Sequence, residues 1–148
     1  MDDRAQLDEQ LLAERVGAAM FAQDAASRAL GMTIDAMGPG YARLTMRVRA
    51  DMLNGFMICH GGFIATLADS AFAFACNSQN LLTVAASISI DFITPAEEGD
   101  LLTAEAREVA MSGRTGIYDV TVTNRRGRTV AVLRGRSHRM KDRKTVPT

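Results

Sequence analysis

Residues 60–78 read HGGFIATLADSAFAFACNS, and this stretch decides the fold. From Gly62 to about Ser78 it is apolar on every side of a helix except around one carboxylate, Asp69. A helix that is apolar all round is enclosed by other elements. We therefore predict a long central helix over Gly62–Ser78, entered through a turn at His60-Gly61-Gly62.

The segments that flank this helix carry strand patterns. Tyr41–Arg49 alternates apolar and polar residues, and the turn before it predicts a short partner strand over Met32–Met37. After the helix, four further runs are predicted to be strands, of which the last closes the sheet: Ala86–Ile93, Leu101–Val109, Gly116–Asn124 and Thr129–His138. Two strands, a buried helix and four successive antiparallel strands predict an α+β fold with the sheet curled around the helix. This order matches the hotdog fold.

The two ends of the chain are predicted to differ. Residues 5–30 have apolar side chains at helical spacing, so we predict an N-terminal helical segment, which a break near Gln23–Ser27 would divide in two. The polar residues 140–148 are predicted to be frayed. Without a linker or repeat, residues 1–148 form a single domain. A curled sheet leaves edge strands unpaired, which favours self-association by sheet extension.

Composition excludes several classes of protein. The 17 basic and 17 acidic residues balance, so no overall positive field is available for nucleic acid. The two cysteines, Cys59 and Cys76, give no disulfide framework and indicate a cytoplasmic protein. His60 and His138 lie far apart, without the spacing of a metal site. The N-terminus lacks the apolar region of a secretion signal, and the central apolar run is too short to span a membrane.

Asp69 is the strongest candidate for a catalytic residue. It is the one charged side chain between Asp51 and Asp91, and its helical neighbours are apolar or neutral. A desolvated, unpaired carboxylate is costly, and such groups gather at functional sites.

The helix start offers a second group. Gly61 and Gly62 would let a substrate carbonyl approach the first amides of the helix, which the helix dipole makes good donors. His60 is either a helix cap or a site residue, and Asn54 is either a turn residue or a group that orients water or substrate. Spacing leaves both alternatives open.

Helix geometry limits how these groups act together. Gly61 and Asp69 are eight positions apart, or about 12 Å along a helix. They cannot reach one carbonyl within one chain. Either the site uses only one of them, or Asp69 of one chain faces Gly61 of another across a two-fold interface.

The sequence resembles the PaaI-type hotdog thioesterases of phenylacetate degradation. The resemblance covers nearly the whole chain, and the segments that carry it are Asn54-Gly55, Cys59-His60-Gly61-Gly62, Leu67–Ala73, Cys76-Asn77-Ser78, Ile90-Asp91-Phe92 with Pro95, Gly113–Asp119 and Arg134–Arg139. It implies an acyl-CoA thioesterase without metal or redox cofactor, acting on phenylacetyl-CoA and especially on its ring-hydroxylated forms. It also implies self-association as a homodimer or a homotetramer, since dimers of this type commonly pair into tetramers.

The same resemblance implies roles for individual residues. Asp69 would be the nucleophile or general base, and the Gly61 amide would polarise the thioester carbonyl. Asn54 and His60 would position the thioester and water. The family's dimers place the Asp and the Gly in different subunits.

Further residues are expected to contact the substrate. Gly62, Phe63 and Phe72 are candidates for the acyl group, with Phe56, Met57 and Phe74 as other large apolar side chains nearby. Arginine forks suit the CoA phosphates, and the candidate cations are Arg114, Arg125, Arg126, Arg128, Arg139 and Lys141.

Two other functions remain open at this stage. One is a hotdog hydratase or dehydratase, although those enzymes pair an Asp with a His suited to proton transfer and His60 sits at the helix start instead. The other is a non-catalytic acyl-CoA-binding subunit, against which the presence of Asp69 argues.

Overall fold

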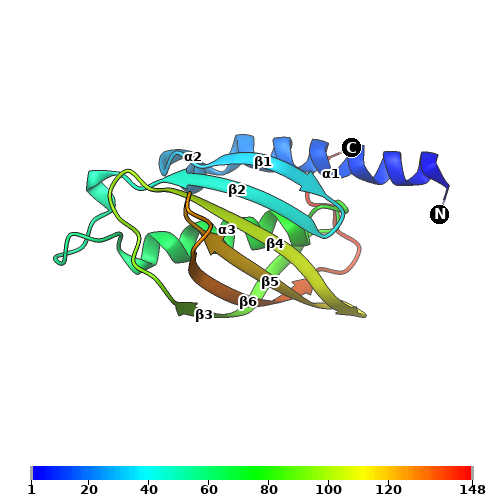
Figure 1. Ribbon diagram of the computed structural model, residues 1–148. Coiled ribbons are helices and arrows are strands. Elements are labelled where there is room, and N and C mark those ends of the chain that lie inside the picture. Colours follow the sequence, from blue (N-terminus) through cyan, green and yellow to red (C-terminus); the bar gives the residue numbers. More distant parts are fainter. Residues whose placement is uncertain (1, 148) are drawn as a thin grey trace.

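The computed structural model describes residues 2–147, which form one curved sheet around a central helix (Figure 1). The helices are α1 (Asp3–Gln23), α2 (Ala25–Ala29), a 3₁₀ turn η1 (Ala50–Met52) and α3 (Gly61–Cys76). The strands are β1 (Thr33–Gly38), β2 (Tyr41–Arg47), β3 (Thr83–Phe92), β4 (Leu101–Ser112), β5 (Thr115–Thr123) and β6 (Thr129–Arg139). The predicted α+β hotdog architecture is confirmed.

The N-terminal helical segment divides where a cap interrupts it. The Asp24 carboxylate accepts hydrogen bonds from the Ser27 N–H at 2.9 Å and the Ser27 hydroxyl at 2.6 Å, which starts α2 and ends α1. The Ser27 hydroxyl also lies 2.9 Å from that of Ser70, which joins α2 to α3. The break near Gln23–Ser27 is therefore confirmed, and Ser27 at this break connects the N-terminal segment to the central helix.

The sheet is antiparallel throughout, with the order β1-β2-β4-β5-β6-β3. The prediction that Thr129–His138 closes the sheet is wrong, because β3 pairs with β6 and occupies the edge. Tight turns at Gly113 and Gly127, both with positive φ, join β4, β5 and β6 as neighbours. The longer connection after Phe92 instead carries the chain from the β3 edge across to β4.

The core lies between α3 and the concave face of the sheet (Figure 1). The Phe72 ring is fully buried, with its centroid 5.5 Å from that of Tyr118. Gly135 on β6 lies directly over this ring: a Cβ added at Gly135 would sit 2.7 Å from Phe72 Cζ. Because Gly135 has no side chain, β6 can pack closely against the Phe72 ring of α3.

We expect Gly135→Ala to destabilise the fold by about 1–3 kcal/mol, the usual cost of overpacking a core. The cost arises because the added methyl group and the enclosed Phe72 ring cannot both keep their places. Denaturant unfolding measures it, with Gly55→Ala as the control because a Cβ there meets nothing within 4 Å. Equal unfolding midpoints for both variants would show that the ring moves aside freely.

The prediction that residues 140–148 are frayed is wrong for the described part of the tail, residues 140–147. Asn80 holds Val146 twice, by accepting from its N–H at 2.9 Å and donating to its carbonyl at 3.1 Å. The Thr145 hydroxyl donates to Asn77 Oδ1 at 2.7 Å. Two buried asparagines after α3 therefore anchor a tail that has almost no apolar residues of its own.

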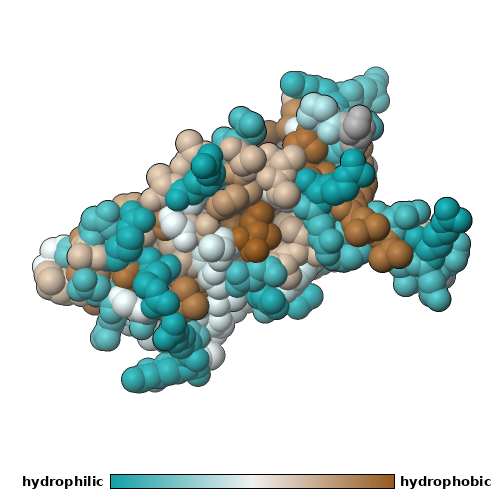
Figure 2. All heavy atoms as spheres, turned by 90° about the horizontal axis from the view of Figure 1, so that it is seen from above, coloured by the Kyte–Doolittle hydropathy of each residue, from teal (hydrophilic) through white to brown (hydrophobic). Residues whose placement is uncertain are grey.

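The β3 edge is the most exposed apolar part of the sheet. Val84, Ile88, Phe92 and the adjoining Ile93 are all exposed, and β3 has a strand neighbour on one side only. The face that carries α1 is hydrophilic mainly around its rim, and apolar atoms gather in its middle (Figure 2). Of the two sheet edges, β1 and β3, the β3 edge therefore exposes more large apolar side chains.

Candidate active site

The first turn of α3 is capped so that one of its amides stays free. His60 is the N-cap, and its Nδ1 accepts a hydrogen bond from the Gly62 N–H at 3.0 Å. This ring nitrogen must be unprotonated to accept, which leaves Nε2 as the protonated nitrogen of the neutral ring. The Gly61 N–H makes no hydrogen bond within residues 2–147. It is therefore a free donor at the positive end of a helix of 16 residues.

Asn54 is both a turn residue and a free donor. Its Oδ1 accepts from the N–H groups of Phe56 at 2.9 Å and Ile58 at 3.4 Å, which holds the loop before α3 in shape. The side-chain amide Nδ2 donates to no group in the described chain. The turn interpretation is thus observed, and the NH₂ group stays available to a ligand.

Gly61 and Asn54 open into one hollow of about 300 Å³. Its lining is mainly apolar and comprises Asn54, Ile58, Cys59, Gly61, Ile64, Phe92, Ile93, Thr94 and Pro95. The Phe92 ring lies against the glycine, because a Cβ at Gly61 would be 3.0 Å from Phe92 Cζ. A side chain at position 61 would narrow the space in front of the free amide.

Residues 92–95 form one wall of this hollow. The sequence alone does not predict them as part of the site. They follow β3, and they meet the start of α3 because β3 occupies the sheet edge. The signal available in the sequence is the proline that ends the strand-like run, at Pro95.

Asp69 lies outside the hollow, two turns further along α3. Its carboxylate is half-buried and makes no hydrogen bond or ion pair within residues 2–147. Desolvation raises the pKa of Asp69 above that of an ordinary aspartate. It shares a partly exposed stripe of α3 with Thr66 and Ala73.

The two cysteines are poor nucleophiles. Both are free and buried. Burial raises the pKa of Cys76 to about 12, and burial also raises the pKa of Cys59. A thiol with a raised pKa is not ionised near neutral pH and is unreactive. Asp69 remains the better candidate for attack or base catalysis.

The residues predicted to contact substrate fall in different places. Phe63 is half-buried, and its ring meets His60 edge-on at 6.1 Å. Gly62 has its N–H occupied by His60, so it offers no amide to substrate. Phe72 belongs to the core, which argues against its predicted substrate contact. Arg114 lies in the β4–β5 turn. The β5–β6 turn, which lies nearer to the Gly61 hollow, is at the other end of β5.

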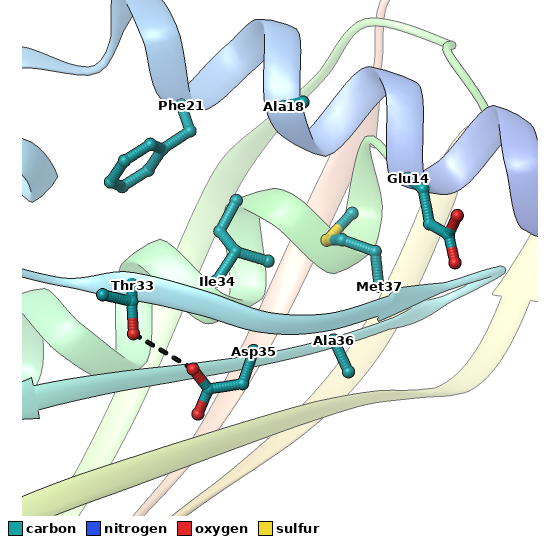
Figure 3. Close-up of a pocket in the computed structure, with 8 residues that line it drawn as sticks. All are labelled: Glu14, Ala18, Phe21, Thr33, Ile34, Asp35, Ala36 and Met37. Carbon is teal, nitrogen blue, oxygen red and sulfur yellow. Dashed lines mark hydrogen bonds between the residues drawn. The ribbon is translucent and has the colours of Figure 1, made fainter.

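A larger hollow of about 460 Å³ lies between α1 and β1 (Figure 3). Phe21, Ile34 and Met37 line it, with Glu14 at one end and Asp35 bonded to Thr33 at 3.0 Å. It borders the opposite edge of the sheet from β3 and contains neither Gly61 nor Asp69. We therefore do not assign the chemistry to it.

Two further observations concern metal sites and membrane-spanning helices. Within residues 2–147, no three or more His, Cys, Asp or Glu side chains are grouped so that they could hold a metal ion. No helix in the same part of the chain is long and apolar enough to cross a membrane.

Comparison with known proteins identifies the family of this chain. The family model of the Thioesterase superfamily matches residues 56–131. The acyl-coenzyme A thioesterase PaaI of Escherichia coli K12 is 49% identical over 122 residues, which cover 82% of this chain and 87% of that protein. The solved structure of E. coli PaaI, from the phenylacetic acid degradation operon, matches with a TM-score of 0.87 and 46% identity over 88% of this chain and 95% of the other.

Two further structures extend the comparison. A mutant of PaaI from Thermus thermophilus has a TM-score of 0.76 and 39% identity, and the match covers 79% of this chain and 100% of the other. A hypothetical thioesterase from Streptococcus pneumoniae, solved with coenzyme A, has a TM-score of 0.73 and 27% identity over 76% of this chain and 91% of the other. This chain belongs to the Thioesterase superfamily, and within it to the PaaI-type acyl-CoA thioesterases.

Proposed function

We propose that this enzyme hydrolyses phenylacetyl-CoA and its ring-hydroxylated forms to the free acid and CoA, in phenylacetate catabolism. The observation that carries the proposal is the unpaired, desolvated Asp69 carboxylate on the helix whose first amide, at Gly61, is free. Those are the two groups that acyl transfer needs, a base or nucleophile and a donor to the carbonyl oxygen. The E. coli relative's name and operon support the substrate class.

In the proposed reaction, the thioester carbonyl oxygen accepts the Gly61 N–H as negative charge develops on it. Asp69 then either removes a proton from the water that attacks the carbonyl carbon, or attacks that carbon itself to form a mixed anhydride, which water hydrolyses to the free acid and the regenerated carboxylate. The carbon–sulfur bond breaks, and the CoA sulfur leaves with a proton that originates from water. Asn54 Nδ2, in the lining of the hollow, and His60 Nε2, on the residue before Gly61, are free donors suited to position the thioester and water.

The site is proposed to form between two subunits. Asp69 and Gly61 are eight residues apart on one helix, about 12 Å by the helical rise. Pairing of two β3 edges about a two-fold axis would run the two α3 helices antiparallel, so that each Asp69 approaches the other subunit's Gly61. The exposed apolar side chains of β3 support this interface. We propose a homodimer that pairs into a homotetramer.

The proposed chemistry needs no resident metal or redox cofactor, because a carboxylate, an amide and water complete the hydrolysis. The two free cysteines support a reducing, cytoplasmic location.

Release of CoA tests the reaction itself. Purified protein is incubated with phenylacetyl-CoA and a thiol-reactive chromophore, and free thiol is measured against time. We expect steady release of one CoA per acid formed. A hydratase or a non-catalytic binding subunit would release none.

Substrate preference is expected to follow the aromatic ring. Phe63 and the exposed Phe56 lie on and before the first turn of α3, where they can flank a flat acyl group. Aromatic contacts of about 0.5–1.5 kcal/mol correspond to about 2- to 12-fold in rate. We therefore expect kcat/KM for phenylacetyl-CoA to exceed that for hexanoyl-CoA by this factor, with ring-hydroxylated substrates equal or better. A preference for long-chain acyl-CoA would contradict the substrate and leave the hydrolysis intact.

A further inference from the structure

A second hollow continues from the one in front of Gly61. It has a volume of about 600 Å³ and shares Thr94 and Pro95 with the first. The rest of its lining consists of Glu97, Glu98, Gly99, Asp100, Asn124, Arg125, Arg126 and Arg128. The two hollows therefore adjoin along the Thr94–Pro95 segment, and we refer to the pair as the groove.

Three arginines of the β5–β6 turn face this groove without partners. The side chains of Arg125, Arg126 and Arg128 make no hydrogen bond or ion pair within residues 2–147. The three exposed like charges lie within four positions, so this turn has a local positive charge that attracts an anion. A guanidinium fork matches the geometry of phosphate oxygens.

The turn that carries them is well ordered by its own hydrogen bonds. Asn124 Oδ1 accepts from the N–H groups of Arg126 at 3.0 Å and Arg128 at 3.1 Å. Gly127 adopts a φ of 76°, which closes the turn. The three guanidinium groups thus project from a fixed backbone.

The segment between the two hollows ties the turn to the start of α3. The N–H groups of Ile93 and Thr94 donate to the Val130 carbonyl at 2.8 and 3.2 Å, beside the turn. The Cys59 N–H donates to the Ala96 carbonyl at 2.8 Å, two residues before Gly61. The arginines therefore hold a fixed position relative to the carbonyl site of the same subunit.

We propose that Arg125, Arg126 and Arg128 bind the phosphates of coenzyme A, in the subunit whose Gly61 holds the thioester carbonyl. This inference rests on the proposed function. Coenzyme A carries a diphosphate and a 3′-phosphate at the far end of its pantetheine arm from the thioester. The groove has the matching layout, with a mainly apolar hollow at Gly61, a neutral stretch at Thr94–Pro95 and three cations beyond it.

Three acidic residues line the same hollow as the arginines. Two of them are Glu97 and Glu98, and neither pairs with an arginine in the described chain. Asp100 is already engaged, since its Oδ2 accepts from the Glu97 N–H at 2.9 Å. These carboxylates repel phosphate, so the three arginines are the groups in this hollow that attract it.

The test compares two substrates that share a thioester and differ in phosphate. With Arg126→Gln/Arg128→Gln, we expect KM for phenylacetyl-CoA to rise about 2- to 30-fold, the size of two exposed charged contacts. We expect kcat to stay nearly constant, because the carbonyl site is untouched. For phenylacetyl-N-acetylcysteamine, which has no phosphate, both constants should equal those of the unmodified enzyme. Arg4→Gln, on the first turn of α1, controls for the loss of positive charge.

Three results would overturn the inference. One is equal KM for phenylacetyl-CoA in the double variant and the unmodified enzyme. Another is an equal loss on both substrates, which would indicate a structural role for the turn. The third is a rise in KM with Arg114→Gln in place of the double variant, which would assign the phosphates to the other turn. Failure of the proposed function is distinct, since the unmodified enzyme would then cleave neither thioester.

Discussion

Asp69→Asn is expected to lower kcat for phenylacetyl-CoA by about 10²-fold or more, the scale of general acid–base contributions. The carboxylate has no partner within residues 2–147, so its replacement breaks no hydrogen bond or ion pair there. The amide has nearly the same shape but neither attacks a thioester nor accepts a proton. Steady-state release of CoA measures the loss, and hydrolysis near the unmodified rate would exclude Asp69 from the chemistry.

The same substitution is expected to stabilise the fold near neutral pH. Burial raises the pKa of Asp69, so in the folded protein the protonated form is favoured. As pH rises from the ordinary aspartate pKa, near 3.9, through the raised folded value, the unmodified protein loses stability because it must ionise a desolvated group. Above that window the penalty is complete. Asparagine carries no such penalty at any pH.

Thermal unfolding of both proteins across this pH range checks the sign. The gain in Tm of the variant should be near zero below about pH 4 and reach a plateau above the folded pKa. A variant that is less stable than the unmodified protein at neutral pH would show that Asp69 stabilises the fold. Activity should follow the opposite course and rise with pH through the same titration, because only the carboxylate acts.

Patterns of burial explain how much of the fold is predictable from sequence. The alternation of apolar and polar residues predicts each strand because one face of the sheet packs on α3. The alternation is lost where a β-bulge shifts the register of the strand. A bulge between Ala85 and Ser87 hides the first residues of β3, and another between Glu108 and Ala110 blurs the second half of β4. The tail is missed for a different reason: Asn77 and Asn80 hold it by hydrogen bonds, which leave no hydrophobic pattern.

The site divides in the same way. Asp69 and the glycines are recognisable because a solitary charge and a Gly-Gly pair are unusual in an apolar run. Phe92 is missed because its place beside Gly61 depends on which strand occupies the sheet edge, and alternation alone does not give strand order. Because the sequence does not give the pairing of β3 with β6, it also does not predict that the Gly61 hollow lies near the β5–β6 turn.

Gly61→Pro is expected to lower kcat by about 10²- to 10³-fold, the cost of losing one oxyanion donor. Position 61 is the first residue of α3, where proline is favoured. The backbone of His60, with φ −58° and ψ 130°, already suits a residue before proline. The change therefore deletes a free N–H without opposing the helix, and circular dichroism should show an unchanged fold.

Gly61→Ala is the matched control, because it adds a methyl group and keeps the N–H. Its Cβ would meet the Phe92 ring at 3.0 Å, but that side chain is 53% exposed and can turn away. We expect a loss below about tenfold, well short of the loss of an oxyanion donor. Equal losses in both variants would indicate that crowding, and not the amide, explains the effect.

The two inactive variants together test whether each site spans two subunits. Asp69→Asn and Gly61→Pro chains are coexpressed with different tags, and hybrid dimers are isolated by two successive affinity steps. If each site takes Asp69 from one chain and Gly61 from the other, a hybrid has one site with both defects and one with neither. It should then show about half the activity of the unmodified dimer, as two-fold symmetry requires. If both groups served the same chain's site, every site in the hybrid would carry one defect, and its activity would stay at the level of the inactive parents.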